Sequence, residues 1–139
     1  MEAAMSARDA AGRGAGQCVA KAAGDLRHTL GPRLTAYAVG LRDPGDIDSF
    51  ARAEARPRRE TADRLCDLHS ITQRLVEGKT PDTAREWMVC SSPLLDDRAP
   101  LEVLHEQSRA PRRSLDAPGW ALDGFRRVED AANAYLDAA

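Results

Sequence analysis

The chain has 139 residues, of which 42% are hydrophobic, 30% are charged and only 4% are aromatic, and its net charge is −2. This length suits one compact domain, or a small domain with a tail. A net charge so close to zero excludes a simple polycation that binds nucleic acid by charge alone. Alanine is abundant and β-branched residues do not alternate with polar ones over any stretch. The sequence therefore predicts an all-α fold with a core of Leu, Val and Ala.

Charge is distributed unevenly along the chain. Residues 1–79 carry 13 basic and 11 acidic side chains, whereas residues 80–139 carry 7 and 11. A weakly basic N-terminal part and an acidic C-terminal part would suit two different binding partners. A globular protein whose surface charges are simply solvated is nearly as good an explanation.

The first predicted helices follow an N-terminal tail. Residues 1–16 are rich in Ala, Gly, Ser and Arg, and are predicted to be disordered. Helical periodicity begins near residue 17 and its apolar stripe ends at Leu30. Pro32 then suits the first turn of a short helix that ends at Gly40.

A third helix is predicted directly after that turn. Asp43 is expected to cap it, and Ile47 and Phe50 are expected to point into the core. Ala36 lies four residues before Gly40, a spacing that lets two helices approach closely, as in a helix-turn-helix. Residues 17–79 are therefore predicted to form a helix-turn-helix-like domain, although an ordinary helical hairpin fits the same spacing.

The predicted helix that contains Ile47 and Phe50 would be the second helix of this helix-turn-helix. Candidate DNA-binding residues lie on it and beside it. Asp46 and Asp48 are also expected on that face, where their carboxylates would repel phosphates. A solvated face with no role in DNA binding fits the same residues. The candidate DNA contacts are Arg42, Ser49, Arg52 and Arg56.

The longest amphipathic stretch runs over residues 59–77 and is ended by Gly78. Its apolar stripe comprises Leu65, Leu68, Ile71 or Thr72, and Leu75. Thr80 is then expected to cap a further helix, in which Trp87 is predicted to be buried.

The stretch "SSPLLDDR", residues 91–98, interrupts the helical pattern. Pro100 is expected to start a short helix, residues 107–119 are expected to be a connection, and the last helix is predicted over about 121–136. The leucines around residues 94–104 either form an exposed cluster rimmed by charges, as at an interface, or close the core over the preceding helix.

Several of these features occur in one order. The motifs are Leu30-Gly31, Gly40, Phe50-Ala51, Pro57, Arg64-Leu65, Trp87, Ser92-Pro93-x-Leu95, Pro100 through Leu104, and Ala131-Ala132 with Tyr135. Over residues 30–136 this order resembles the Xre/MbcA/ParS antitoxin family, the partners of RES-domain toxins. The chain departs from the family pattern at Phe50, where a Trp is usual, and at Ser92, where an Asn is usual.

The resemblance implies an antitoxin that is not an enzyme. It implies that residues 80–139 form a helical part that binds a cognate RES-domain toxin and blocks access to the active site of that NAD-consuming enzyme. It also implies a homodimer with weak autoregulatory binding to operator DNA. A stand-alone helical regulator or adaptor without a toxin is the alternative. The candidate toxin contacts are Leu95, Arg98, Leu101, Leu104, Val128, Tyr135 and Leu136.

Cofactor, metal and membrane features are not expected. The three histidines and three cysteines show no ligand spacing, and the odd number of cysteines is typical of a reducing cytosol, so a cytoplasmic location is predicted. Cys66 and Cys90 are expected to be small buried side chains. The sequence contains no predicted transmembrane run or signal peptide.

Overall fold

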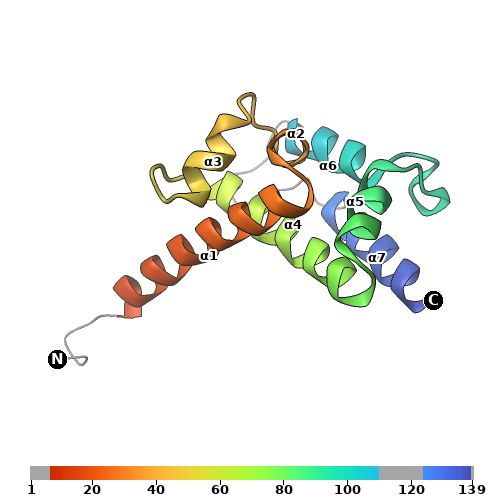
Figure 1. The fold of residues 1–139 in the computed structure, drawn as a ribbon, viewed down its shortest axis with the longest axis horizontal. Helices are drawn as coiled ribbons and strands as arrows, with labels where there is room; N and C mark the ends of the chain where they lie inside the picture. The colour runs from red at the N-terminus through yellow and green to blue at the C-terminus, as the bar shows by residue number, and fades with distance from the viewer. Residues whose placement is uncertain (1–6, 110–123, 139) are drawn as a thin grey trace.

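The computed structural model describes residues 7–109 and 124–138, and in these ranges the fold is all-α, with no strand (Figure 1). Predictions that fall on residues 1–6, 110–123 and 139 lie outside the described residues. The helices are α1 Ala7–Thr29, α2 Pro32–Val39, α3 Gly45–Ala51, α4 Arg59–Gly78, α5 Pro81–Val89, the 3₁₀-helix η2 Pro93–Leu95, α6 Pro100–Arg109 and α7 Gly124–Asp137.

The first helix is longer than the sequence predicted. It begins at Ala7, so the prediction of a disordered tail is wrong for residues 7–16. Four alanines in that stretch are strong helix formers, although the three glycines among them are not. The first turns of α1 extend beyond the rest of the molecule (Figure 1).

Helix α4 is the element around which the others pack. Its side chains Leu65, Leu68, Ile71 and Leu75 are completely buried, as the amphipathic pattern predicted. The helix crosses the middle of the molecule, and α1, α2, α5 and α7 all contact it (Figure 1). Buried residues on both sides of residue 79 belong to one cluster. The two parts predicted as separate domains, 17–79 and 80–139, therefore share one core.

Helices α1 and α3 pack against each other in the front half. Ile47 and Phe50 of α3 are buried, as predicted. The expectation that Asp48 faces outward is corrected, because its carboxylate forms an ion pair with Arg27 of α1. With Ile47 and Phe50 directed into the core, this seven-residue helix also turns Asp48 toward α1.

The turn after α2 requires a glycine. Gly40 has a φ of 82° and a ψ of 24°, the left-handed conformation, and its N–H points to the carbonyls of Ala36 and Tyr37. A Cβ on Gly40 would lie only 2.6 Å from Oγ of Ser108, so the turn also lets α6 approach α2. The predicted helix end at Gly40 is confirmed.

Two predicted caps have different outcomes. The Thr80 hydroxyl accepts a hydrogen bond from the Thr83 N–H at 3.1 Å, which confirms the predicted cap of α5. Asp43 lies one residue farther from its helix than predicted, because α3 begins at Gly45. Its Oδ1 still accepts the Gly45 N–H at 2.8 Å, so it satisfies one of the free donors at that helix start.

A polar contact joins α1 to α4 beside the core. Asp25 Oδ2 lies 2.8 Å from His69 Nε2 and accepts a hydrogen bond from Lys21 at 3.0 Å. Burial alone would raise the pKa of Asp25, but the hydrogen bonds from Lys21 and His69 outweigh it and lower that pKa below its ordinary value of 3.8.

We predict that Asp25→Asn lowers the free energy of unfolding at neutral pH. Because folding depresses the pKa of Asp25, its contribution is present above pH 3.8 and is lost as the pH falls through the lower folded value. Urea denaturation at a series of pH values should show the two proteins converging in acid. Asp130→Asn, at an exposed carboxylate of α7, is the control and should match the wild type throughout. A deficit in Asp25→Asn that persists unchanged into acid would contradict this account.

Candidate docking surface

Residues 92–98 form a closed loop between α5 and α6. The Ser92 N–H donates to the Arg98 carbonyl at 3.0 Å, and the Arg98 N–H donates back to the Leu95 carbonyl at 3.1 Å. Asp96 and Asp97 have φ values of 57° and 62°, a left-handed conformation that aspartate tolerates better than most residues. The sequence showed an interruption here, and the structure shows that the interruption is a compact hydrogen-bonded turn.

This turn separates its two leucines. Leu94 and Leu95 are neighbours in η2, where successive residues point about 120° apart. Leu95 is 1% exposed and belongs to the core, whereas Leu94 is 59% exposed. Leu94 is the most exposed large hydrophobic side chain among the described residues. The turn therefore presents one apolar side chain to solvent while another anchors it.

Helix α7 lies beside the turn and is held on both sides. Arg127 of α7 donates to Asp96 of the turn at 3.0 Å. On the other side, Arg74 of α4 donates to Asn133 and Glu129, both at 3.3 Å. These contacts fix the position of α7 relative to η2 and α4, so the space between Leu94 and α7 has a defined shape.

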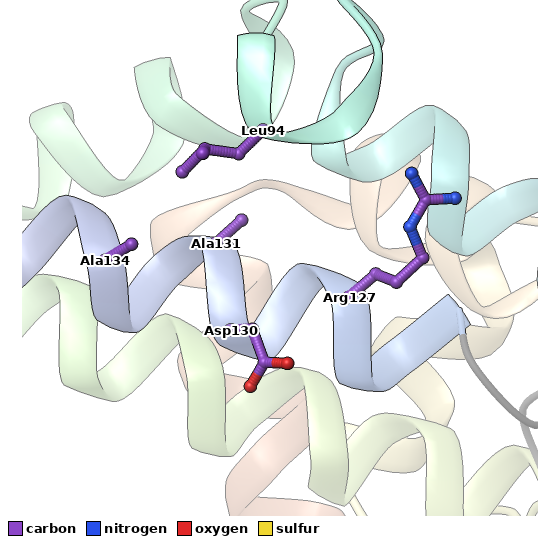
Figure 2. A pocket seen from close by; sticks show the side chains of 5 residues that line it. All are labelled: Leu94, Arg127, Asp130, Ala131 and Ala134. Atoms are coloured by element: carbon purple, nitrogen blue, oxygen red, sulfur yellow. The ribbon is translucent and has the colours of Figure 1, made fainter.

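Two shallow depressions lie on either side of Leu94. The first, of about 360 Å³, is lined by Leu94, Arg127, Asp130, Ala131 and Ala134. Figure 2 shows Leu94 reaching from the turn toward the side of α7 that carries Ala131 and Ala134. The small alanine side chains leave this space open below Leu94 (Figure 2).

The second depression, of about 350 Å³, lies toward the end of α5. It shares Leu94 and Ala134 with the first, so the two form one continuous surface, which we call the Leu94 groove. The remaining lining residues are Trp87, Cys90, Ser91, Ser92, Pro93, Tyr135 and Ala138.

An aromatic pair forms one wall of the Leu94 groove. The rings of Trp87 and Tyr135 have centroids 5.9 Å apart and are tilted by 31°. Lys79 places its ammonium group 5.3 Å from the centre of the Tyr135 ring. Trp87 is only partly buried, so the prediction that it lies fully beneath residues 91–98 is corrected. One part of its ring contacts the core and another part lines the groove.

Most of the predicted toxin contacts are not accessible. Leu95, Leu101, Leu104 and Val128 are each at most 3% exposed and belong to the core, so their prediction as surface anchors is corrected. The alternative interpretation, that these leucines close the core, is the one that the structure confirms. Of the predicted contacts, Tyr135 alone lines the groove.

The other two predicted contacts have intramolecular partners. Arg98 pairs with Glu106 of α6, and the hydrogen bond from that pair raises the pKa of the Arg98 guanidinium. Leu136 is partly buried and packs on Gly78, where an added Cβ would lie 2.6 Å from Leu136 Cδ2. Leu136 therefore joins α7 to the end of α4.

The groove residues of α7 follow a pattern that is visible in the sequence but lies next to its apolar stripe. Positions 127, 131, 134 and 138 recur at helical spacing next to the buried stripe, and three of the four are alanines. A run of small residues beside an apolar stripe is typical of a helix face that leaves room for another group. Only the position of η2 made that face part of a groove.

The candidate DNA contacts lie around α3, away from the groove. Arg42, Arg52 and Arg56 are exposed and Ser49 is partly exposed. Arg42 precedes α3, Ser49 is within it, and the other two follow it. Their exposure leaves the guanidinium groups available to an anion.

The remaining predictions for the described residues concern metal ligands, cysteines and membrane-spanning helices. No group of three or more His, Cys, Asp or Glu side chains there is placed to hold a metal ion. The expectation that Cys66 and Cys90 are buried is corrected, since Cys66 is partly exposed and Cys90 is exposed. Within residues 7–109 and 124–138, none of the helices has the length and apolar character needed to cross a membrane.

Comparison of the chain with protein-family models, with curated proteins and with solved structures found no match in any of the three.

The left-handed residues of the turn give a test of its geometry. Asp97 is exposed and has a φ of 62°. Asp97→Val should therefore lower the free energy of unfolding by about 1–2 kcal/mol, because a β-branched residue is strained at positive φ. Asp97→Gly should stay within about 1 kcal/mol of the wild type, since glycine adopts this conformation freely. Chemical denaturation of both variants measures the difference. Equal stability of the two would show that the turn has another conformation in solution.

Proposed function

We propose that the chain is a non-catalytic binding protein that docks a partner protein in the Leu94 groove. The partner, on the family resemblance of residues 30–136, is a RES-domain toxin whose activity the complex blocks. The observation that carries the proposal is Leu94 itself. Leu94 is 59% exposed, is held out by a hydrogen-bonded turn, and lines the same depression as Trp87 and Tyr135. A contiguous apolar surface of this kind is typical of a protein-binding site.

The composition of the groove also supports a protein partner. Its floor is made of alanines and its walls of Leu94, Trp87 and Tyr135. Interface cores are enriched in such aromatic and apolar side chains, with polar groups at the rim. An inserted apolar side chain would gain contacts on two sides without displacing a charge.

Charge around the groove favours a basic partner surface. Asp97 of the turn and Asp130 of the groove lining are exposed carboxylates, and the one cation in the lining, Arg127, is already paired with Asp96. Enzymes bind the diphosphate of NAD with positively polarised groups, which are backbone N–H groups at a helix N-terminus or Arg and Lys side chains. An acidic rim would therefore be attracted to the entrance of such a site and would compete with its anionic ligand.

We predict that Leu94→Asp abolishes toxin neutralisation while the helical circular dichroism spectrum is unchanged. Replacing a central apolar anchor by a carboxylate should weaken binding by at least about 30-fold, or about 2 kcal/mol. Ala134→Asp, in the floor of the groove, should have the same effect. The assay is co-expression with a RES-domain toxin encoded beside the chain, scored by growth rescue and by co-purification of the two proteins.

The control is Val89→Asp. Val89 is 45% exposed and lines neither depression, so the same change of charge there should leave rescue intact. Surface variants are preferable to removal of α7, because Val128 and Ala132 are buried and their loss would open the core. Full rescue by Leu94→Asp would place the toxin contact elsewhere. Size-exclusion chromatography of the chain alone tests the homodimer that the resemblance implies.

Weak binding to operator DNA is a second candidate function. It is favoured by the exposure of Arg42, Arg52 and Arg56, and by the ion pair of Asp48 with Arg27, which removes one expected repulsive charge from the α3 surface. This function does not exclude the first, because the candidate DNA contacts and the Leu94 groove have no residue in common.

We predict that the chain alone binds its own promoter weakly and loses that binding steeply as salt rises. Asp46→Asn should strengthen the binding by removing a like charge from the approach surface, and Arg52→Ala should weaken it. Fluorescence anisotropy titrations at low and at physiological salt measure both effects. Nanomolar, sequence-selective binding at physiological salt would contradict the prediction.

A further inference from the structure

Two cysteines that are far apart in the sequence meet between α1 and α4. The Sγ atoms of Cys18 and Cys66 lie 2.9 Å apart, although 48 positions separate the two residues. A disulfide bond is about 2.05 Å long, so the two sulfurs need only a small side-chain adjustment to bond. The third cysteine, Cys90, is exposed at the end of α5 and lines the Leu94 groove.

The two thiols differ in access. Cys18 is exposed, whereas Cys66 is partly covered. Burial raises the pKa of Cys66 to about 12, helped by its hydrogen bond with Cys18 and by the carboxylates of Asp67 and Asp63. Cys66 therefore stays protonated at neutral pH, and a soluble reagent meets Cys18 first.

We propose that Cys18 and Cys66 form a reversible redox site that a low-molecular-weight disulfide, such as oxidised glutathione, converts to an intramolecular disulfide. The proposal rests on the approach of the two sulfurs and on the accessibility of one of them. It is independent of the docking function, since neither cysteine lines the Leu94 groove.

The reaction proceeds in two exchange steps. Cys18 loses its proton and its sulfur attacks one sulfur of the small disulfide, so a mixed disulfide forms and the other half leaves as a thiolate that takes up a proton. Cys66 then loses its proton and attacks the Cys18 sulfur, and the second small thiol leaves and is protonated in the same way. The two protein thiols lose two electrons and two protons, which the oxidant carries away as two thiols.

The product would join α1 covalently to α4. The α1 contacts with α3 and α4 would then be retained whenever the non-covalent core loosens, because the closed loop includes α2, α3 and the start of α4. The N-terminal half of the molecule would become more resistant to local unfolding under oxidising conditions.

The test counts free thiols in the full chain. The reduced protein is equilibrated with an excess of oxidised glutathione, quenched with an alkylating reagent and weighed by mass spectrometry under denaturing conditions. The reduced protein should take up three alkyl groups, as its three cysteines require. The Cys90→Ser variant should take up two before oxidation and none after it, and its digest should contain a cross-linked Cys18–Cys66 peptide.

Two further variants test the order of attack. Cys66→Ala should retain glutathione on Cys18, because the second thiol is missing. Cys18→Ser should take up glutathione on Cys66 more slowly than Cys66→Ala takes it up on Cys18, because the Cys66 thiol is partly covered. Two free thiols in oxidised Cys90→Ser would overturn the proposal, as would glutathione held stably on Cys18 or cross-linked dimers in place of the internal disulfide.

Discussion

The buried face of α4 is the constraint on which the remaining structure depends. Leu65, Leu68, Ile71 and Leu75 are completely buried, and they contact helices from both halves of the sequence. A large-to-small substitution in such a position costs about 2–5 kcal/mol, a sizeable part of the stability of a small domain. The front helices and the C-terminal helices are therefore stabilised by the same core and are expected to unfold together.

The polar contacts around that core determine which charged side chains remain exposed to solvent. Arg64, which is 9% exposed, reaches the Val39 carbonyl at 3.4 Å and places a cation at the end of α2. Asp48 pairs with Arg27, so part of the acidic charge of α3 is used inside the molecule. The charges left exposed include the arginines near α3 and the aspartates near the Leu94 groove, which lie at different places on the surface.

The turn of residues 92–98 and the thiol pair depend on the core in the same way. Leu95 anchors the turn and thereby holds Leu94 in solvent. The packing of α1 on α4 brings Cys18 to Cys66. In both cases a buried apolar contact positions an exposed side chain, and no local sequence motif predicts that position.

The sequence by itself determined the helices, because periodicity, Pro, Gly and capping residues act over a few positions. The stripe of α4, the Gly40 turn and the Thr80 cap were predicted correctly on that basis. The sequence could not determine which leucine of the Leu94-Leu95 pair is buried, because both are equally apolar and only the turn geometry separates them. It also could not show that Cys18 meets Cys66, since contacts between residues distant along the chain are decided by the packing of whole helices in the tertiary structure.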